Sequence, residues 1–375
     1  MLDRFKLIVE LQKIAPSLFI DTHSSYDLIQ KAWQALSNDP TFFLKVQQCT
    51  DAPWPIPLWK DNLAHTIPVE TYTNAHIVFS VDGSQIYPDR HNSLPCFLIN
   101  TGIVILPYNG AQSTVQLLSE PTVFAGNDND QALLTIDGIN CKRQELELAA
   151  GLKIGKEIKK NNPTTQSILL FDGSLIFWHL SSKEPEIRNY FLYSYLQLLD
   201  EFYHEKILQC WYISMPKSKE LINLVRLYLC NFDHTKKELY EPINSVIDST
   251  IMHTVLKPQY RSIVLSNHSS ISTYYPSHLR PFFFYLNTGN EIGRVEIPAW
   301  IAHDDSLVSI VAQIVIDQCI KGGGYPVALA EAHEQAVVKG ADREFFYHFL
   351  QKMGMERNYK HAISRKSLKK RGMGI

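Results

Sequence analysis

The sequence lacks the features that mark membrane, secreted and zinc-binding proteins. Its six cysteines are widely scattered and form no C-x-x-C pair, so they indicate neither a zinc site nor a disulfide framework. No uninterrupted apolar run reaches the roughly 18 residues that a membrane span needs, and the N-terminus, MLDRFKLIVELQK, mixes charged with apolar residues. We therefore expect a cytoplasmic chain that is neither inserted in a membrane nor exported by a recognisable signal.

Net charge is also nearly absent. Lys and Arg number 36 against 38 Asp and Glu, a formal charge of -2, so a nucleic-acid or membrane partner would have to be met by local patches. What the 375 residues do contain is 45% hydrophobic and 11% aromatic side chains. This composition is typical of a soluble globular protein with one large domain or two modest ones, and it excludes disorder, collagen and a disulfide-stapled miniprotein.

The pattern along the chain divides it into three parts. Residues 1–75 are predicted to form a helical N-terminal extension, which ends in the Pro/Trp-rich stretch DAPWPIPLW. Residues 76–350 alternate strands with helices and are predicted to form an α/β domain. Residues 351–375 form a basic C-terminal tail.

The domain is predicted to begin with three antiparallel strands, then a helix, then a parallel strand. The strands are HIVFSVDGSQI, PCFLINTGIVILPY and STVQLLSEPTVFA, joined by turn-forming residues. A helix follows from about 137 to 160, with Asp137 as its expected N-cap. The apolar strand SILLFDGSL should then pair in parallel with the first strand. Later segments predict further helices and the strands CWYISMP, RPFFFYLN and GRVEIPAW, and a last helix over 327–338, so the sheet is mixed.

A doubled Asp-Gly-Ser is the sharpest motif. Asp82 and Asp172 each stand where an apolar strand ends and a Gly-Ser turn begins, which is where open α/β sheets bind ligands. On neighbouring parallel strands they would lie about 5 Å apart. Two carboxylates 4 Å apart repel by about 4 kcal/mol at an effective dielectric near 20. This repulsion is removed if one of them is protonated or if a cation binds between them. Either copy alone is simply a common turn, but two matching copies favour a hard cation, Mg²⁺ or Mn²⁺.

Acids on the intervening helix are candidates for the same site. In RQELELAAG, helical spacing directs Glu147 towards the sheet, while Glu145 remains a competitor. The alternative is that both belong to a solvated helix face, as most helical charges do.

The last helix contributes His333, which its spacing places on the apolar side. A lone histidine in that position is more often a hydrogen-bonded core residue than a ligand. His333 is therefore a candidate metal ligand only if other candidate ligands lie beside it. Glu331 and Glu334 flank it on other faces, either solvated or within reach of a metal. The preceding turn, GGGYP, lacks the Gly-Lys-Ser/Thr ending of a phosphate loop and is interpreted as a hinge.

Taken in order, these motifs resemble the NurA family of DNA repair nucleases. The resemblance runs from about residue 76 to about residue 345 and rests on VDGSQI, the R-x-x-x-E helix at Arg143 and Glu147, LLFDGSL, GRVEIPAW and GYPVALAEAHEQA. It implies a ribonuclease-H-like fold, in which a mixed sheet of three antiparallel strands, a helix and parallel strands is flanked by helices.

The resemblance also implies a site and an activity. Asp82, Glu147, Asp172 and His333 match the family's catalytic, manganese-binding positions, which hold Mn²⁺ or Mg²⁺, with two ions expected. Arg294 and Glu296 fall in a family motif without an assigned role. The implied protein is a homodimeric DNA exonuclease and endonuclease that degrades DNA 5′ to 3′, cuts single strands internally, and processes ends in double-strand break repair with a hexameric HerA-type ATPase.

Two other functions fit parts of the pattern. One is a phosphotransferase of the actin-like fold, which binds nucleotide and magnesium with similar Asp-Gly turns, although the chain has no second Gly-rich adenosine motif. The other is a non-catalytic scaffold for an ATPase partner. Contact with DNA would involve the basic tail, whose cations are Arg357, Lys360, Arg365, Lys366, Lys369, Lys370 and Arg371, or aromatic residues between 274 and 285, most of which should be core.

Overall fold

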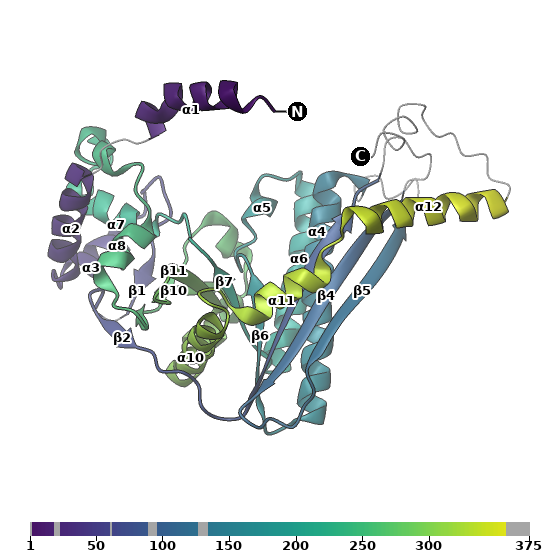
Figure 1. The fold of residues 1–375 in the computed structure, drawn as a ribbon. Helices are drawn as coiled ribbons and strands as arrows, with labels where there is room; N and C mark the ends of the chain where they lie inside the picture. The colour runs from purple at the N-terminus through teal and green to yellow at the C-terminus, as the bar shows by residue number, and fades with distance from the viewer. Residues whose placement is uncertain (1, 19–22, 61, 89–95, 127–133, 358–375) are drawn as a thin grey trace.

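The computed structural model describes residues 2–18, 23–60, 62–88, 96–126 and 134–357 (Figure 1). Its strands are β1 (Leu58–Trp59), β2 (Thr66–Pro68), β3 (His76–Ile86), β4 (Cys96–Tyr108), β5 (Gln116–Ala125), β6 (Gln166–Asp172), β7 (Leu208–Ile213), β8 (Tyr260–Ser262), β9 (Leu265–Ser266), β10 (Pro281–Asn287) and β11 (Ile292–Pro298). Its α-helices are α1 (Arg4–Leu18), α2 (His23–Ser37), α3 (Phe42–Gln48), α4 (Ile136–Asn161), α5 (Trp178–Ser181), α6 (Pro185–His204), α7 (Glu220–Leu229), α8 (Asp248–Val255), α9 (Ala299–Ala302), α10 (Asp305–Lys321), α11 (Val327–Ala336) and α12 (Gly340–Glu356).

The strands form one mixed sheet in the order β1-β9-β10-β11-β7-β6-β3-β4-β5, with β2 and β8 paired beside β10. As predicted, β3, β4 and β5 are antiparallel neighbours and β6 returns parallel to β3. Strand β7 then adds parallel to β6, and β11 pairs with β7 antiparallel. The predicted α/β fold with a mixed sheet flanked by helices is therefore confirmed.

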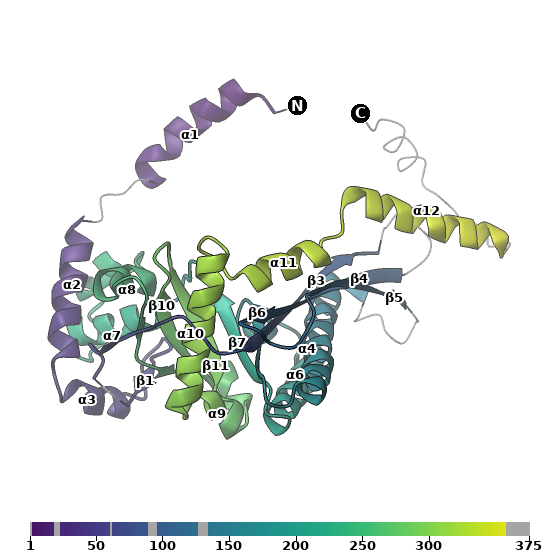
Figure 2. The same cartoon turned by 60° about the horizontal axis from the view of Figure 1, so that its bottom comes forward.

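Helices cover both faces of the sheet. Alternate side chains point to opposite faces of a strand, so Ile77, Phe79 and Val81 of β3 pack in the cluster beneath α4 and α6. Val78, on the opposite face, packs in the cluster with α10 and α11. Figure 2 shows α11 lying along one side of β3 and β4, with α4 and α6 on the other. Any residue at the end of β3 or β6 thus lies between α4 and α11.

The N-terminal region differs from the predicted helical extension. It contains β1 and β2, which pair with β9 and β8 of the main sheet, and α2 and α3 pack in one cluster with α7 and α8. Helix α1, in contrast, has no buried residue, and it lies apart from the sheet in Figure 1. Residues 23–75 are therefore built into the core that supports β10 and β11.

Some predicted boundaries also need correction. Helix α4 is capped by Thr135, whose side chain accepts a hydrogen bond from Gly138 N at 2.9 Å, and not by Asp137. The sequence over about 186–209 predicts one long helix, but α6 ends at His204 and β7 begins at Leu208. A further helix, α12, follows α11 and crosses the predicted boundary at residue 350. Of the cations from residue 357 onwards that were predicted to contact DNA, Arg357 alone lies among the described residues. Within those residues, none of the helices is both long and apolar enough to cross a bilayer.

Candidate metal centre

Asp82 and Asp172 lie on neighbouring parallel strands. Asp172 is the last residue of β6, but Asp82 lies inside β3, which continues to Ile86, so the turn predicted after the first aspartate was wrong. The register of β3 on β6 pairs Ser80 with Leu170, and the same register continued by two residues puts Asp82 opposite Asp172. Residues two apart on a strand share a face, and both aspartates line one cavity of about 410 Å³ together with His333. The structure therefore brings together the two copies of the Asp-Gly-Ser motif.

Helix α11 reaches this cavity because β4 carries a glycine opposite Asp82. A Cβ atom on Gly102 would lie 2.4 Å from the carbonyl oxygen of Ala332 and from the amide nitrogen of Ala336. Any side chain there would push the helix away. The amide of Asn100 also donates to the carbonyl oxygen of Ala336 at 2.8 Å, which holds the C-terminal end of α11 against the strand.

His333 is carried by α11 onto Asp82. Its Nδ1 lies 2.8 Å from Oδ2 of Asp82, while 65% of the His333 side chain remains exposed. The prediction that His333 lies on the apolar side was wrong, because Leu329, Ala332 and Ala336 fill that side instead. Glu331 and Glu334 line the same cavity.

Glu147 approaches the aspartates from α4, on the opposite face of the sheet. A Cβ atom on Gly83 would lie 2.5 Å from Glu147 Oε1, so the glycine of the first Asp-Gly-Ser leaves room for this carboxylate. Only 15% of the Glu147 side chain is exposed, and Arg143 Nε lies 3.3 Å from Oε1. Burial raises the pKa of Glu147 to about 8, with the charge of Arg143 opposing the rise and those of Asp82 and Asp172 adding to it.

The competing acid, Glu145, points elsewhere. Its carboxylate lies 2.5 Å from the ammonium group of Lys142 and accepts a hydrogen bond from the hydroxyl of Ser194 on α6. These contacts direct Glu145 to the α4–α6 interface. Of the two glutamates, Glu147 is the one placed beside the aspartates.

Tyr325 is a site residue that the sequence interpretation missed. It lines the same cavity as Asp172, and its hydroxyl partly offsets the burial that raises the pKa of that carboxyl. The glycine turn before it is anchored, because Asn290 Nδ2 donates to Gly323 O at 2.9 Å and Gly324 has a φ of 125°. The position of Tyr325 in the sequence, between the glycine turn and the helix that carries His333, could have indicated that it belongs to the site.

The donor set fits a hard divalent cation. Carboxylate oxygens and an imidazole are ligands of Mn²⁺, and carboxylates are those of Mg²⁺. Glu147 Oε1 is buried, and its contact with Arg143 Nε at 3.3 Å lacks hydrogen-bond geometry, so a bound cation could replace that contact. Within those same residues, no three His, Cys, Asp or Glu side chains lie close enough to hold an ion as placed. Asp82 pairs with His333 and Glu147 with Arg143 instead, so these side chains must move before three of them can share an ion.

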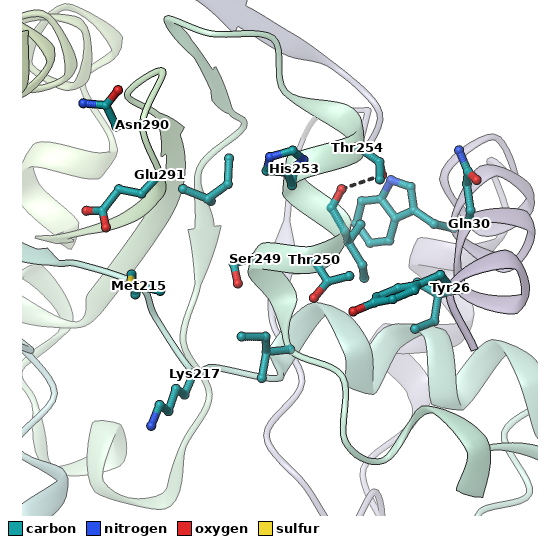
Figure 3. A pocket seen from close by; sticks show the side chains of 15 residues that line it. Tyr26, Gln30, Met215, Lys217, Ser249, Thr250, His253, Thr254, Asn290 and Glu291 are labelled. Carbon is teal, nitrogen blue, oxygen red and sulfur yellow. Dashed lines mark hydrogen bonds between the residues drawn. The ribbon is translucent and has the colours of Figure 1, made fainter. Parts of the chain in front are cut away.

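A larger pocket lies away from this chemistry. It has a volume of about 650 Å³ and is lined by residues of α2, α8 and the loop after β7, among them Tyr26, Trp33, Met215 and His253 (Figure 3). None of the four predicted site residues lines it.

The comparisons with known proteins point to one family. The NurA domain model matches residues 76–338. A search among curated proteins finds no match. One crystal structure of NurA covers 82% of this chain and 94% of its own at 9% identity, with a TM-score of 0.37. A NurA structure with manganese covers 87% and 95% at 10% identity (TM-score 0.37), and one bound to dAMP and manganese covers 86% and 95% at 10% identity (TM-score 0.34).

Proposed function

Because this chain belongs to the NurA family, we propose that it is a metal-dependent nuclease that hydrolyses phosphodiester bonds in DNA. The observation that carries the proposal is the meeting of Asp82, Asp172 and His333 in one cavity, with Glu147 beside the two aspartates. The order of three antiparallel strands, a helix and a parallel strand supports a ribonuclease-H-like fold.

The carboxylates of Asp82, Asp172 and Glu147 would hold Mn²⁺ or Mg²⁺, with two ions expected. When bound, such ions lower the pKa of water and stabilise the oxygens of an in-line displacement at phosphorus. The hydroxyl of Tyr325 shares the cavity with Asp172 and favours the ionised form of that carboxyl, which is the form that binds a cation.

His333 is placed to accept a proton. Its Nδ1 faces Oδ2 of Asp82, and a carboxylate partner favours the tautomer with the proton on that nitrogen. The Nε2 atom then carries a lone pair, which suits either a general base for the attacking water or a second metal ligand.

A second cavity beside the site has features that suit unpaired DNA. It has a volume of about 340 Å³ and includes Ser174, which follows Asp172 closely in the chain, together with Trp178 and Lys217. Trp178 is 43% exposed, and exposed aromatic rings are the surfaces on which unpaired bases stack. The ammonium group of Lys217 would meet the phosphate backbone.

The finer activity follows the family. We propose 5′ to 3′ exonuclease and single-strand endonuclease action in DNA end processing and double-strand break repair, with a hexameric HerA-type ATPase as partner. We also propose a homodimer, which is supported by the exposed apolar residues Leu117 and Val123 on β5, the last strand of the sheet. Co-elution of purified chain and ATPase, and the mass of the chain in solution, test these two assemblies.

Plasmid and linear DNA, each with and without Mn²⁺, test the proposed reaction. Wild-type protein should degrade DNA only with the metal, and Asp82→Ala should not. Glu145→Gln is the matched control, because it removes an acid of the same region that faces α6, and it should retain activity. Degradation by Asp82→Ala at the wild-type rate would show that the site is wrong. Nucleotide-dependent thermal stabilisation without nuclease activity would instead favour the actin-like phosphotransferase.

A further inference from the structure

A buried glutamate on β11 holds the loop that follows Asp172. Oε2 of Glu296 accepts two hydrogen bonds at 2.8 Å, one from the hydroxyl of Ser174 and one from the backbone N–H of Leu175. Only 1% of Glu296 is exposed. Strand β6 ends at Asp172 and Gly173 has a φ of 93°. The last backbone bond to β7 runs from Gly173 N to Tyr212 O at 3.0 Å, and side-chain contacts hold the loop at Ser174 and Leu175.

The other oxygen of Glu296 is tied to the core. Oε1 lies 2.8 Å from Nε of Arg294, and Nη1 of Arg294 lies 3.0 Å from Oε1 of Glu220. The guanidinium group is stacked 3.7 Å from the ring centroid of Phe283. A buried ion pair with such geometry has little freedom to rearrange, so Glu296 is a rigid link between the core and the loop.

We propose that Glu296 is a positioning residue for the metal centre, which sets the place of Asp172 through Ser174 and Leu175. Outer groups that orient a metal ligand commonly contribute 10-fold to 100-fold in metal affinity. The expected effect on metal affinity rests on the proposed function. The tether, meaning the two hydrogen bonds that join Glu296 to Ser174 and Leu175, does not.

Glutamine cannot replace Glu296. The amide of Glu296→Gln has one acceptor oxygen. If that oxygen faces Arg294, the NH₂ group meets two donors, Ser174 and Leu175; if it faces the loop, the NH₂ group meets the guanidinium. In either orientation hydrogen-bond donors face donors. The variant therefore loses its hydrogen bonds either to the loop or to Arg294, although the side-chain volume is unchanged.

The same buried network offers a matched control. Asp248 is also fully buried and also accepts one backbone N–H and one hydroxyl, from Ile222 N at 2.9 Å and from Tyr285 at 2.7 Å. Its side-chain hydrogen bonds among the described residues go to Ile222 and Tyr285 and not to the Asp172 loop. Asp248→Asn therefore reports the loss of a buried acid without the loss of the tether.

The experiment compares wild type, Glu296→Gln, Ser174→Ala and Asp248→Asn. Free Mn²⁺ is titrated by electron paramagnetic resonance, and hydrogen exchange of the loop after Asp172 is measured in EDTA. Glu296→Gln should bind Mn²⁺ about 10-fold to 100-fold more weakly and exchange faster in the loop. Ser174→Ala removes only the hydrogen bond from the half-buried Ser174 hydroxyl to Glu296. It should therefore weaken Mn²⁺ binding and speed loop exchange by less than Glu296→Gln does. Asp248→Asn should lower the unfolding temperature and leave both readouts at the wild-type level.

The outcomes separate the tether from the nuclease. Wild-type loop exchange and wild-type Mn²⁺ affinity in both Glu296→Gln and Ser174→Ala would overturn the proposal. An equal loss of affinity in Asp248→Asn would also overturn it, because the effect would then be general destabilisation. If wild-type protein neither binds Mn²⁺ nor cleaves DNA, the proposed function fails, and loop exchange in EDTA still decides whether Glu296 holds the loop.

Discussion

Replacing Glu147 by glutamine should stabilise the metal-free protein at alkaline pH. The pKa of this carboxyl is raised from 4.5 to about 8 by burial, with nearby Asp82 and Asp172 adding to the effect. A group whose pKa is higher in the folded chain than in the unfolded chain costs stability once the pH exceeds the unfolded value, because unfolding then releases a proton. The cost therefore begins near pH 4.5 and grows until about pH 8.

The size of the effect follows from the shift. Each pKa unit corresponds to about 1.4 kcal/mol, so the wild-type fold loses at most about 5 kcal/mol of unfolding free energy between these limits. Glu147→Gln keeps the shape and removes the ionisation. The difference between variant and wild type should be near zero at pH 5 and several kcal/mol in favour of the variant at pH 9.

Urea unfolding in EDTA at pH 5, 7 and 9 measures this difference. Glu145→Gln, which instead loses the contact with Lys142, serves as control and should show no such gain. A difference that does not change with pH would refute the reasoning. Added Mn²⁺ should stabilise wild type more than Glu147→Gln, and equal stabilisation would show that Glu147 is not a ligand.

Three other substitutions test the packing around the site. Gly83→Ala places a Cβ where the Glu147 carboxylate lies; activity should fall about 100-fold, as expected for an ångström of misplacement, with little change in unfolding temperature. Gly102→Ala meets the backbone of α11 and should cost about 1–3 kcal/mol, measured by denaturation, and move His333 off its partner. Asp172→Ala should lose nuclease activity yet retain its unfolding temperature in EDTA, since one repelling acid is removed; unfolding of this variant would indicate a structural role.

The fold and the aspartate pair were accessible from the sequence because they depend on local pattern. Apolar runs specified β3 and β6 and the aspartate that each strand carries, although β3 continues past Asp82 to Ile86 and only β6 ends at its aspartate. The interpretation was weaker between 232 and 277, where short strands and 3-10 helices depend on packing partners distant in sequence. The strands of the N-terminal region were missed for the same reason, since β1 and β2 exist only through their pairing with β9 and β8.

What the sequence by itself determined is which residues are chemically able to form the site and the two neighbouring strands that carry two of them. Tertiary structure decided the rest: Glu147 over Glu145 beside the aspartates, the exposed side of His333, and the participation of Tyr325 and Glu296. Helical spacing fixes only the direction of a side chain around its own axis. Which neighbour it meets depends on how closely two backbones approach, and here the glycines at 83 and 102 set that approach.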